Sequence, residues 1–199
     1  MISKHLLAAV IVLFAVTIAM SVYVWQLRRR ETEAPRLKTP AKAQQVVPPR
    51  GPAEQVTLYV AYDNPGILVA QSVTATLGSG PQERAENLLR ELVSRYTASN
   101  SPHPLASGAE VRKVYLVDPG LAVIDVNSTF VDGQVSGILS EELTIASMIQ
   151  TLAANIPDVT RVKVLVDGKE RETLAGHADL TRIYDVSQVA ELTKELAGK

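Results

Sequence analysis

Three histidines are the residues of this 199-residue chain best suited to acid–base chemistry, because imidazole titrates near neutral pH. His5 flanks an apolar run, and His103 lies in a Ser-Pro-His-Pro loop, where we expect it to be exposed to solvent. His177 precedes Asp179 by two residues, a pair that could orient a general base. No serine or cysteine stands in a nucleophile-elbow context beside that pair. We therefore predict a structural role for His177, such as a turn hydrogen bond.

Carboxylates are the next candidates for chemistry. Glu141 and Glu142 are adjacent, so on a helix their side chains point about 100° apart and do not converge. A position in the first turn of a helix explains them through the helix dipole. Four aspartates could contribute to a site for a hard cation, but their spacing matches no calcium-binding loop, and Asp is common in turns. These residues are Asp118, Asp125, Asp132 and Asp167.

A single Gly-x-Gly sequence, Gly78-Ser79-Gly80, precedes a predicted helix. It lacks the third glycine of the dinucleotide-binding pattern, and Pro81 removes one backbone donor from the helix terminus. The chain has no cysteine, which excludes disulfides and thiolate metal sites. We therefore predict no catalytic residue, no metal site and no cofactor, and we expect the protein not to be an enzyme.

The longest apolar run of the chain, Leu6–Leu27, contains no charge, proline or glycine. A helix of this length covers about 33 Å, enough to cross a bilayer core of about 30 Å. Tyr23 and Trp25 stand near its end, where aromatic rings prefer the headgroup layer. A retained transmembrane anchor is the main prediction. A cleaved signal peptide and a buried helix of a soluble domain are the alternatives.

Charge is divided unevenly between a basic linker and an acidic domain. Arg28 to Arg50 holds seven basic and two acidic residues, whereas Gly51 to Lys199 holds twelve and nineteen. Five prolines make the linker an extended spacer. Arg28-Arg29-Arg30 after the span favours a domain that faces the cytoplasm. The acidic domain argues against a nucleic-acid partner, which requires a basic surface.

The pattern of the first half predicts two strands, a helix and a hairpin. Alternating apolar residues mark the strands, and a one-sided apolar stripe that starts after Pro81 and includes Leu88, Leu92 and Tyr96 marks the helix. Pro119-Gly120 is a turn signal between the two strands of the hairpin. The strands are predicted at Gln55–Tyr62, Ile67–Leu77, Val111–Val117 and Leu121–Val126.

The second half is predicted to begin with a loop, Asn127–Ser136, and a helix that Ser140 caps and that Asn155 and Pro157 end. Its apolar side chains again suggest one buried face. Asp167-Gly168 predicts a hairpin turn. The remaining expected elements are a strand Val162–Val166, a returning strand Lys169–Leu174, an irregular stretch Gly176–Tyr184 and a short terminal helix that Asp185 and Gln188 begin.

The order β-β-α-β-β-α-β-β, followed by a short helix, predicts an α+β fold. We expect two amphipathic helices to pack on one face of a single mixed or antiparallel sheet. The expected organisation is a segment 1–27 with the transmembrane helix, a basic Pro-rich linker 28–54, an α+β domain 55–184 and a C-terminal helix 185–199.

These sequences resemble the GerMN domain family of sporulation and spore germination proteins over roughly Gln55 to Tyr184. The matching stretches are VTLYVAY, ERAENLLRELV, VYLVDPGLAVIDVNSTF, SEELTIASMIQTLAANIPDVTRVKVLVDGKERETL and the closing GHADL. The resemblance implies a noncatalytic module that lies outside the cytoplasm. The chain departs from the duplicated, lipid-anchored arrangement, since it has one copy and no cysteine for lipid attachment.

The resemblance and the anchor together predict a non-enzymatic, membrane-anchored extracytoplasmic module for protein–protein assembly in the bacterial envelope. Its expected partners are the bilayer, through Leu6–Leu27, unidentified envelope proteins and further copies of itself, but not nucleic acid. Three alternatives stay open: a domain that binds cell-wall glycan or another small polar ligand, a scaffold that faces the cytoplasm as Arg28–Arg30 suggest, and a hydrolase that uses His177.

Overall fold

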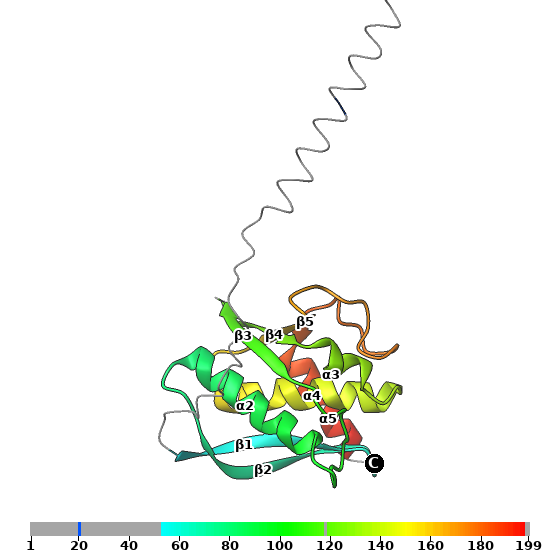
Figure 1. Ribbon diagram of the computed structural model, residues 1–199. Helices are drawn as coiled ribbons and strands as arrows, with labels where there is room; N and C mark the ends of the chain where they lie inside the picture. Colours follow the sequence, from blue (N-terminus) through cyan, green and yellow to red (C-terminus); the bar gives the residue numbers. More distant parts are fainter. Residues whose placement is uncertain (1–19, 21–52, 118, 198–199) are drawn as a thin grey trace, which may run out of the picture. The chain divides into compact units, whose positions relative to one another are not determined.

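The computed structural model describes Met20, residues 53–117 and residues 119–197 (Figure 1). The predicted span Leu6–Leu27, apart from Met20, and the linker up to residue 52 lie outside the described residues. Within the described part, no helix combines the length and the apolar character needed to cross a bilayer. The described part is α+β, as predicted, but its sheets differ from the expected arrangement.

The two strands predicted at the start of the domain are confirmed, and the structure pairs them as an antiparallel hairpin. Strand β1 spans Ala53–Tyr62 and β2 spans Ile67–Thr76, and their register is continuous along all ten residues. The alternation seen in the sequence places Val56, Leu58 and Val60 in the core. These two strands form a sheet of their own.

The helix predicted after Pro81 is confirmed as α2, Pro81–Tyr96. Gly80 is the extended N-cap residue, and Pro81 occupies the first turn, where its missing N–H is not needed. The buried face contains Leu88, Leu89, Leu92 and Tyr96, so this helix is amphipathic in the expected way.

A second, four-stranded sheet has the order β3-β4-β5-β6. The predicted hairpin supplies its antiparallel pair β3–β4, and β5 lies parallel to β4. The prediction of one sheet is therefore wrong, because the first hairpin forms a separate sheet. The strands are β3 Val111–Val117, β4 Leu121–Val126, β5 Arg161–Val166 and β6 Tyr184–Asp185.

The predicted returning strand Lys169–Leu174 is also wrong. The Asp167-Gly168 turn forms, with φ values of 50° and 73°, but it is followed only by isolated bridges, between Val166 and Lys169 and between Thr173 and Asp179. The buried Leu174 instead donates its N–H to Ala178, which draws the chain into an irregular loop. Strand β6 takes the place beside β5.

The segment Asn127–Ser136, predicted as a loop, contains a short helix α3, Ser128–Asp132. Asn127 caps it by accepting a hydrogen bond from the N–H of Phe130, whose side chain is buried. The next helix, α4, spans Ile138–Asn155 and begins at Gly137, so the prediction that Ser140 caps it is wrong. Its end at Asn155 is confirmed.

Helix α4 lies in the middle of the molecule. Figure 1 shows the β1–β2 hairpin on one side of α2 and α4 and the four-stranded sheet on the other. Every residue from Leu143 to Leu152 is buried. The expectation of a single buried face on α4 is therefore wrong, since its serine, threonine and glutamine side chains are enclosed together with the aliphatic ones.

The chain ends in helix α5, Val186–Ala197, which contacts α4 and β2. Asp185 begins this helix as predicted, because its Oδ1 accepts hydrogen bonds from the backbone N–H groups of Ser187 and Gln188. Val189 is buried and Leu196 packs against the core.

Candidate functional site

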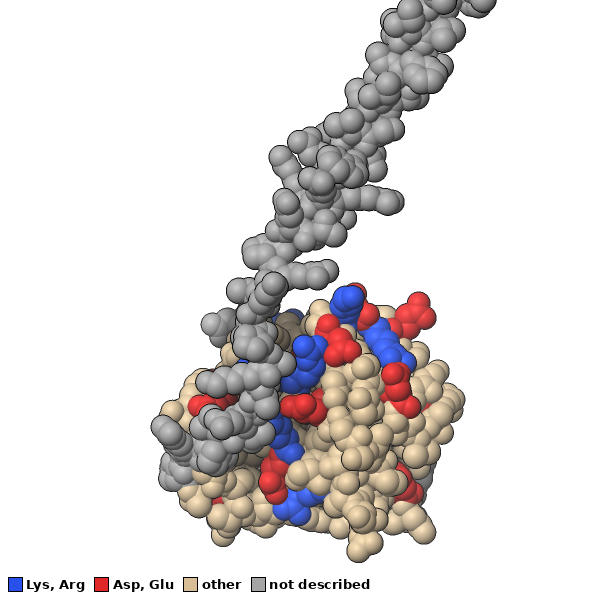
Figure 2. All heavy atoms as spheres, in the orientation of Figure 1, with Lys and Arg blue, Asp and Glu red and all other residues tan. Residues whose placement is uncertain are grey.

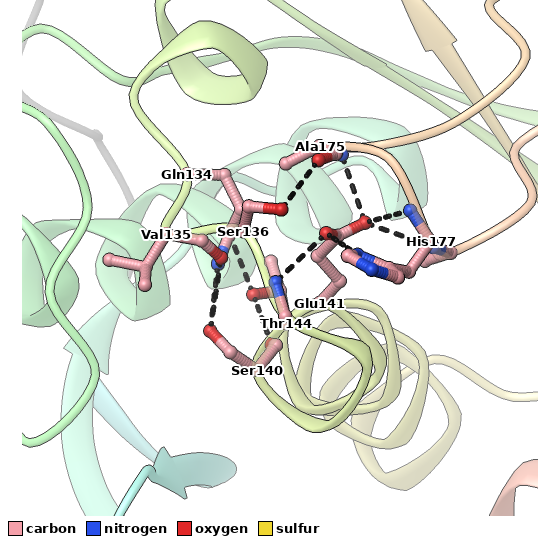
Figure 3. Close-up of polar contacts among 10 residues, drawn as sticks. Gln134, Val135, Ser136, Ser140, Glu141, Thr144, Ala175 and His177 are labelled. Atoms are coloured by element: carbon pink, nitrogen blue, oxygen red, sulfur yellow. Dashed lines mark hydrogen bonds and ion pairs between the residues drawn. The ribbon is translucent and has the colours of Figure 1, made fainter.

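The most heavily hydrogen-bonded side chain of the predicted set is Glu141, in the first turn of α4 (Figure 3). Its carboxylate has no exposure to solvent. Oε2 accepts hydrogen bonds of 2.9 Å from the backbone N–H groups of Ala175, His177 and Ala178. Oε1 lies 2.8 Å from Nδ1 of His177 and 3.2 Å from the N–H of Gly137. We call these five residues the Glu141 clamp.

The loop geometry explains how three N–H groups reach one carboxylate oxygen. Gly176, at the centre of the loop, has a φ of +121°, a conformation that a side chain would strain. Successive backbone N–H groups that converge in this way form a concave site for an anion. In this protein the anion is supplied by the chain itself, from α4.

The clamp keeps Glu141 ionised. Burial by itself would raise the pKa of this carboxyl, but the hydrogen bonds from the His177 ring and the three backbone N–H groups outweigh that effect and lower the pKa to about 2. The carboxylate is thus neither a proton donor at neutral pH nor accessible to a ligand. The predicted partner of His177, Asp179, is replaced by Glu141, and the His177 side chain is 42% exposed.

A second polar cluster lies deeper, between the β1–β2 turn and α4. Nδ1 of His103 lies 2.6 Å from Oδ1 of Asp63, and Nε2 lies 2.6 Å from Oγ1 of Thr144. The Thr144 hydroxyl is also 2.9 Å from Oε1 of Gln134. His103 has no exposed surface and meets the Tyr96 ring edge-on, with centroids 4.9 Å apart. The prediction that His103 is exposed is therefore wrong.

The order hydroxyl–imidazole–carboxylate is the one that nucleophilic hydrolases use. Here Thr144 and His103 are completely buried, so no substrate can contact the Thr144 hydroxyl in this structure. The hydroxyl is also placed to donate to Gln134 or to the Ser140 carbonyl. We interpret the cluster as a polar connection that joins the β1–β2 turn to α4.

The family model for Germane, described as sporulation and spore germination, matches residues 57–172 of the chain. This range contains Glu141, Thr144 and His103. The chain belongs to the Germane family. The sequence-based resemblance to GerMN domains is thereby confirmed.

Two solved structures illustrate the likeness. The first GerMN domain of the sporulation protein GerM from Bacillus subtilis is 19% identical, with a TM-score of 0.48, over 64% of this chain and 92% of that one. The tandem GerMN domains of the same protein are also 19% identical, with a TM-score of 0.49, over 65% of this chain and 44% of that one. A search of the curated proteins gives no match.

The remaining candidates of this Germane-family chain have structural partners, and Arg112 contacts two of them, since its Nη1 lies 3.8 Å from Oδ2 of Asp125. Asp125 is buried and accepts a hydrogen bond from the N–H of Gly168, whereas Asp167 pairs with Arg112 at 2.9 Å. Asp132 pairs with Arg171. Asp118 and His5 lie outside the described residues. Within the residues that the structure describes, no three His, Asp or Glu side chains are grouped as a metal site would require.

The Gly78-Ser79-Gly80 turn does not form an anion site. The Glu83 side chain fills the space into which a Cβ of Gly78 would project. A carboxylate at that position repels phosphate from the N-terminus of α2. Glu142, the neighbour of Glu141, is partly exposed and takes no part in the clamp.

Sequence reasoning missed Asp63, Gln134 and Thr144 as members of a site. The available signal was the presence of Thr144, Ser147 and Thr151 within the apolar pattern of α4. Polar side chains inside a buried helix need partners, so these residues mark positions where the helix is hydrogen-bonded to other elements. Thr151 Oγ1, for example, accepts a hydrogen bond from the N–H of Tyr59.

Proposed function

We propose that this chain is a noncatalytic assembly module that is anchored in a bacterial membrane by Leu6–Leu27 and that positions its Germane-family domain on the extracytoplasmic side. Membership of a sporulation and spore germination family supports an envelope role. The buried His103 and Glu141 are hydrogen-bonded within the fold, which supports a role in protein contact rather than in catalysis.

The observation that carries this proposal is a group of exposed apolar side chains where α4 begins. Val135, Ile138 and Leu139 are 54%, 63% and 39% exposed, within five residues of one another. Leu139 also lies against Gly66 in the β1–β2 turn. Exposed aliphatic side chains that are grouped together are typical of protein interaction sites. We call these three residues the α4 apolar surface.

Topology is the first test of this function. A reporter that is active only outside the cytoplasm, fused after Lys199 of the full chain, is expected to give signal in living cells. A matched fusion of a reporter that is active only in the cytoplasm is expected to give none. The reverse result would contradict the extracytoplasmic proposal and favour the orientation that Arg28–Arg30 suggest.

The second test addresses contact. In cells that produce the full chain, chemical cross-linking is expected to yield discrete adducts with envelope proteins, and Ile138→Ser should reduce them. Ile183→Ser provides a matched control, because Ile183 is 50% exposed elsewhere on the domain. Equal adducts in both variants and the parent chain would contradict a role for the α4 apolar surface.

A further inference from the structure

The outer edge of β1 is closed by helix side chains. Asn155 accepts a hydrogen bond from the N–H of Thr57 at 3.0 Å and donates to its carbonyl at 2.6 Å. The N–H of Tyr59 donates to Thr151, and that of Ala61 donates to the Tyr96 hydroxyl at 2.8 Å. Alternate backbone groups along this strand are therefore satisfied without a neighbouring strand.

Strand β3, at the edge of the four-stranded sheet, is closed in a similar way along its first half. Arg90 of α2 donates to the carbonyls of Val111 and Arg112 at 3.2 Å and 3.0 Å. Glu86 accepts from the N–H of Val114 at 3.4 Å. Charged side chains gather on this face, as Figure 2 shows in blue and red, and charge also deters strand pairing.

The outer edge of β2 is different. Thr57, Tyr59 and Ala61 turn their N–H groups away from β2, so the residues opposite them also turn their backbone groups outward. The register extends this outward set to Thr74, opposite Gln55. Among the residues that the structure describes, none is hydrogen-bonded to these outward groups of β2. The outward-facing residues are Leu68, Ala70, Ser72 and Thr74.

The side chains of β2 also lack the usual protection of an edge strand. Its ten residues, ILVAQSVTAT, include no charge, proline or glycine, and its register with β1 has no bulge. Natural proteins normally protect a long edge strand with charged residues, proline or a bulge, since an unprotected edge pairs with another strand. Val69, on the face that points toward the helices, is still 36% exposed. Within the part of the chain that the structure describes, the edges of β1 and of much of β3 are therefore closed, whereas the edge of β2 is open.

We propose that β2 pairs with β2 of a second copy of this chain, antiparallel, so that two hairpins form one four-stranded sheet in the order β1-β2-β2-β1. This inference deepens the assembly function by naming the surface for self-association. A second copy is the occupant that fits this strand. The domain is acidic, with twelve basic and nineteen acidic residues after residue 50, so two copies repel over most of their surface, but β2 itself carries no charge. Two copies can therefore pair along β2 without like charges facing each other.

The pairing is two-fold symmetric, as is usual for homodimers. Only the even-numbered residues of β2 turn their backbone groups outward, so only they can hydrogen-bond to the second copy. Two antiparallel registers meet this condition and pair nine residues of each strand. One register places Ser72 opposite its own copy, and the other places Gln71 opposite its own copy. In both, the small outer side chains of Ala70, Ser72 and Thr74 from the two copies interdigitate on one face.

The chain contains no cysteine, so single cysteines report this contact cleanly. In the full chain in detergent solution, Ser72→Cys or Gln71→Cys is expected to form a disulfide-linked dimer under mild oxidation. The position that reacts faster identifies the register. Ser107→Cys, an exposed serine in the 97–108 loop, is the matched control and should stay monomeric. Equal dimer formation at Ser107 would overturn the proposal.

Charge complementation gives a second and independent readout. The parent chain is expected to show twice the 21.5 kDa protein mass of one copy, and Ser72→Lys and Ser72→Glu should each reduce it to one. Mixing these two variants should restore the doubled mass, because the opposite charges then lie directly or diagonally across the axis from each other in either register. Ser107→Lys should leave the dimer intact.

The outcomes separate this inference from the assembly function. A monomeric parent chain, or a dimer that survives both charge variants, would overturn the β2 pairing. Either result would leave the cross-linking of envelope proteins through the α4 apolar surface unaffected. Conversely, a parent chain that forms the β2 dimer but no adducts with envelope proteins would contradict the assembly function in the envelope, while the β2 contact stands.

Discussion

Glu141 shows how a single side chain can organise a loop that has little regular structure. Its carboxylate gathers the N–H groups of Ala175, His177 and Ala178, which have no strand or helix partner of their own. An ionised acceptor makes these hydrogen bonds stronger than neutral ones. The loop that replaces the predicted strand 169–174 is therefore held in place from α4.

The clamp predicts a defined acid sensitivity. Because the folded-state pKa of Glu141, about 2, lies below its ordinary value of 4.5, its stabilising effect is complete above that ordinary value. It is lost as the pH falls from 4.5 to 2, and the shift corresponds to about 3 kcal/mol of unfolding free energy. Urea unfolding across this pH range should show this loss of unfolding free energy in the parent chain but not in Glu141→Gln, which lacks the carboxylate.

His177→Ala is the companion variant for the clamp. It removes the Nδ1 contact but keeps the three backbone N–H groups. The unfolding free energy lost between pH 4.5 and pH 2 should therefore be smaller than in the parent chain and larger than in Glu141→Gln. An identical pH dependence in the parent chain and Glu141→Gln would contradict the role assigned to the carboxylate.

Thr144 is the residue on which the second polar cluster depends. Thr144→Val keeps the shape of the side chain but leaves Nε2 of the buried His103 without its hydroxyl partner. We expect the free energy of unfolding to fall by about 1–3 kcal/mol, as chemical denaturation would measure. Ser107→Ala, at an exposed site, should change the free energy of unfolding little. A Thr144→Val protein as stable as the parent chain would refute the structural role of the cluster.

At the scale of elements, side chains of α2 and α4 do for β1 what a third strand would normally do. The side chains that reach the backbone groups along the edge of β1 are those of Asn155, Thr151 and Tyr96. This arrangement explains why a two-stranded hairpin is stable beside the helices. It also explains the polar residues within the apolar pattern of α4.

Tyr96→Phe tests this edge contact. The variant removes the hydroxyl that accepts a hydrogen bond from the buried N–H of Ala61, and we expect a loss of about 1–3 kcal/mol of unfolding free energy. Hydrogen exchange should show the Ala61 amide becoming less protected. Unchanged protection at that amide would show that the Tyr96 hydroxyl does not close the edge.

The β3–β4 turn depends on Gly120, whose φ is +70°. A Cβ at this position would lie 2.6 Å from Oγ1 of Thr160 and 2.7 Å from the carbonyl oxygen of Asp158. Gly120→Ala should therefore lower the midpoint of thermal unfolding and destabilise the protein by at least about 1–2 kcal/mol. Gly80→Ala is the control, since a Cβ there meets nothing within 4 Å. A Gly120→Ala protein as stable as that control would contradict this prediction.

For the whole molecule, we propose that an anchor at Leu6–Leu27 and the linker after it decide where the domain operates. The Leu6–Leu27 run is long enough to span a bilayer. We expect the full chain to stay in the membrane fraction after alkaline carbonate washing and to require detergent for release. A chain without residues 6–27 should be released, and release of the full chain by carbonate alone would contradict a transmembrane anchor.

Much of the domain was predictable from local patterns. Alternation, helical spacing and turn residues, which act over a few positions, predict the bounds of the β3 and β4 strands, the presence of the strands β1 and β2, helix α2 and the cap at Asp185. The family resemblance was also visible in the sequence. These features depend on neighbours along the chain, so the sequence alone determined them.

Only the tertiary structure decided which strands pair and which partners the buried polar groups have. Glu141 meets residues more than thirty positions away, and His103 lies between Asp63 and Thr144, about forty positions to either side. The division into two sheets, the enclosure of α4 and the open edge of β2 arise in the same way. Burial makes an unpaired polar group costly, so the partner of each group is chosen by the packed fold and not by its sequence neighbours.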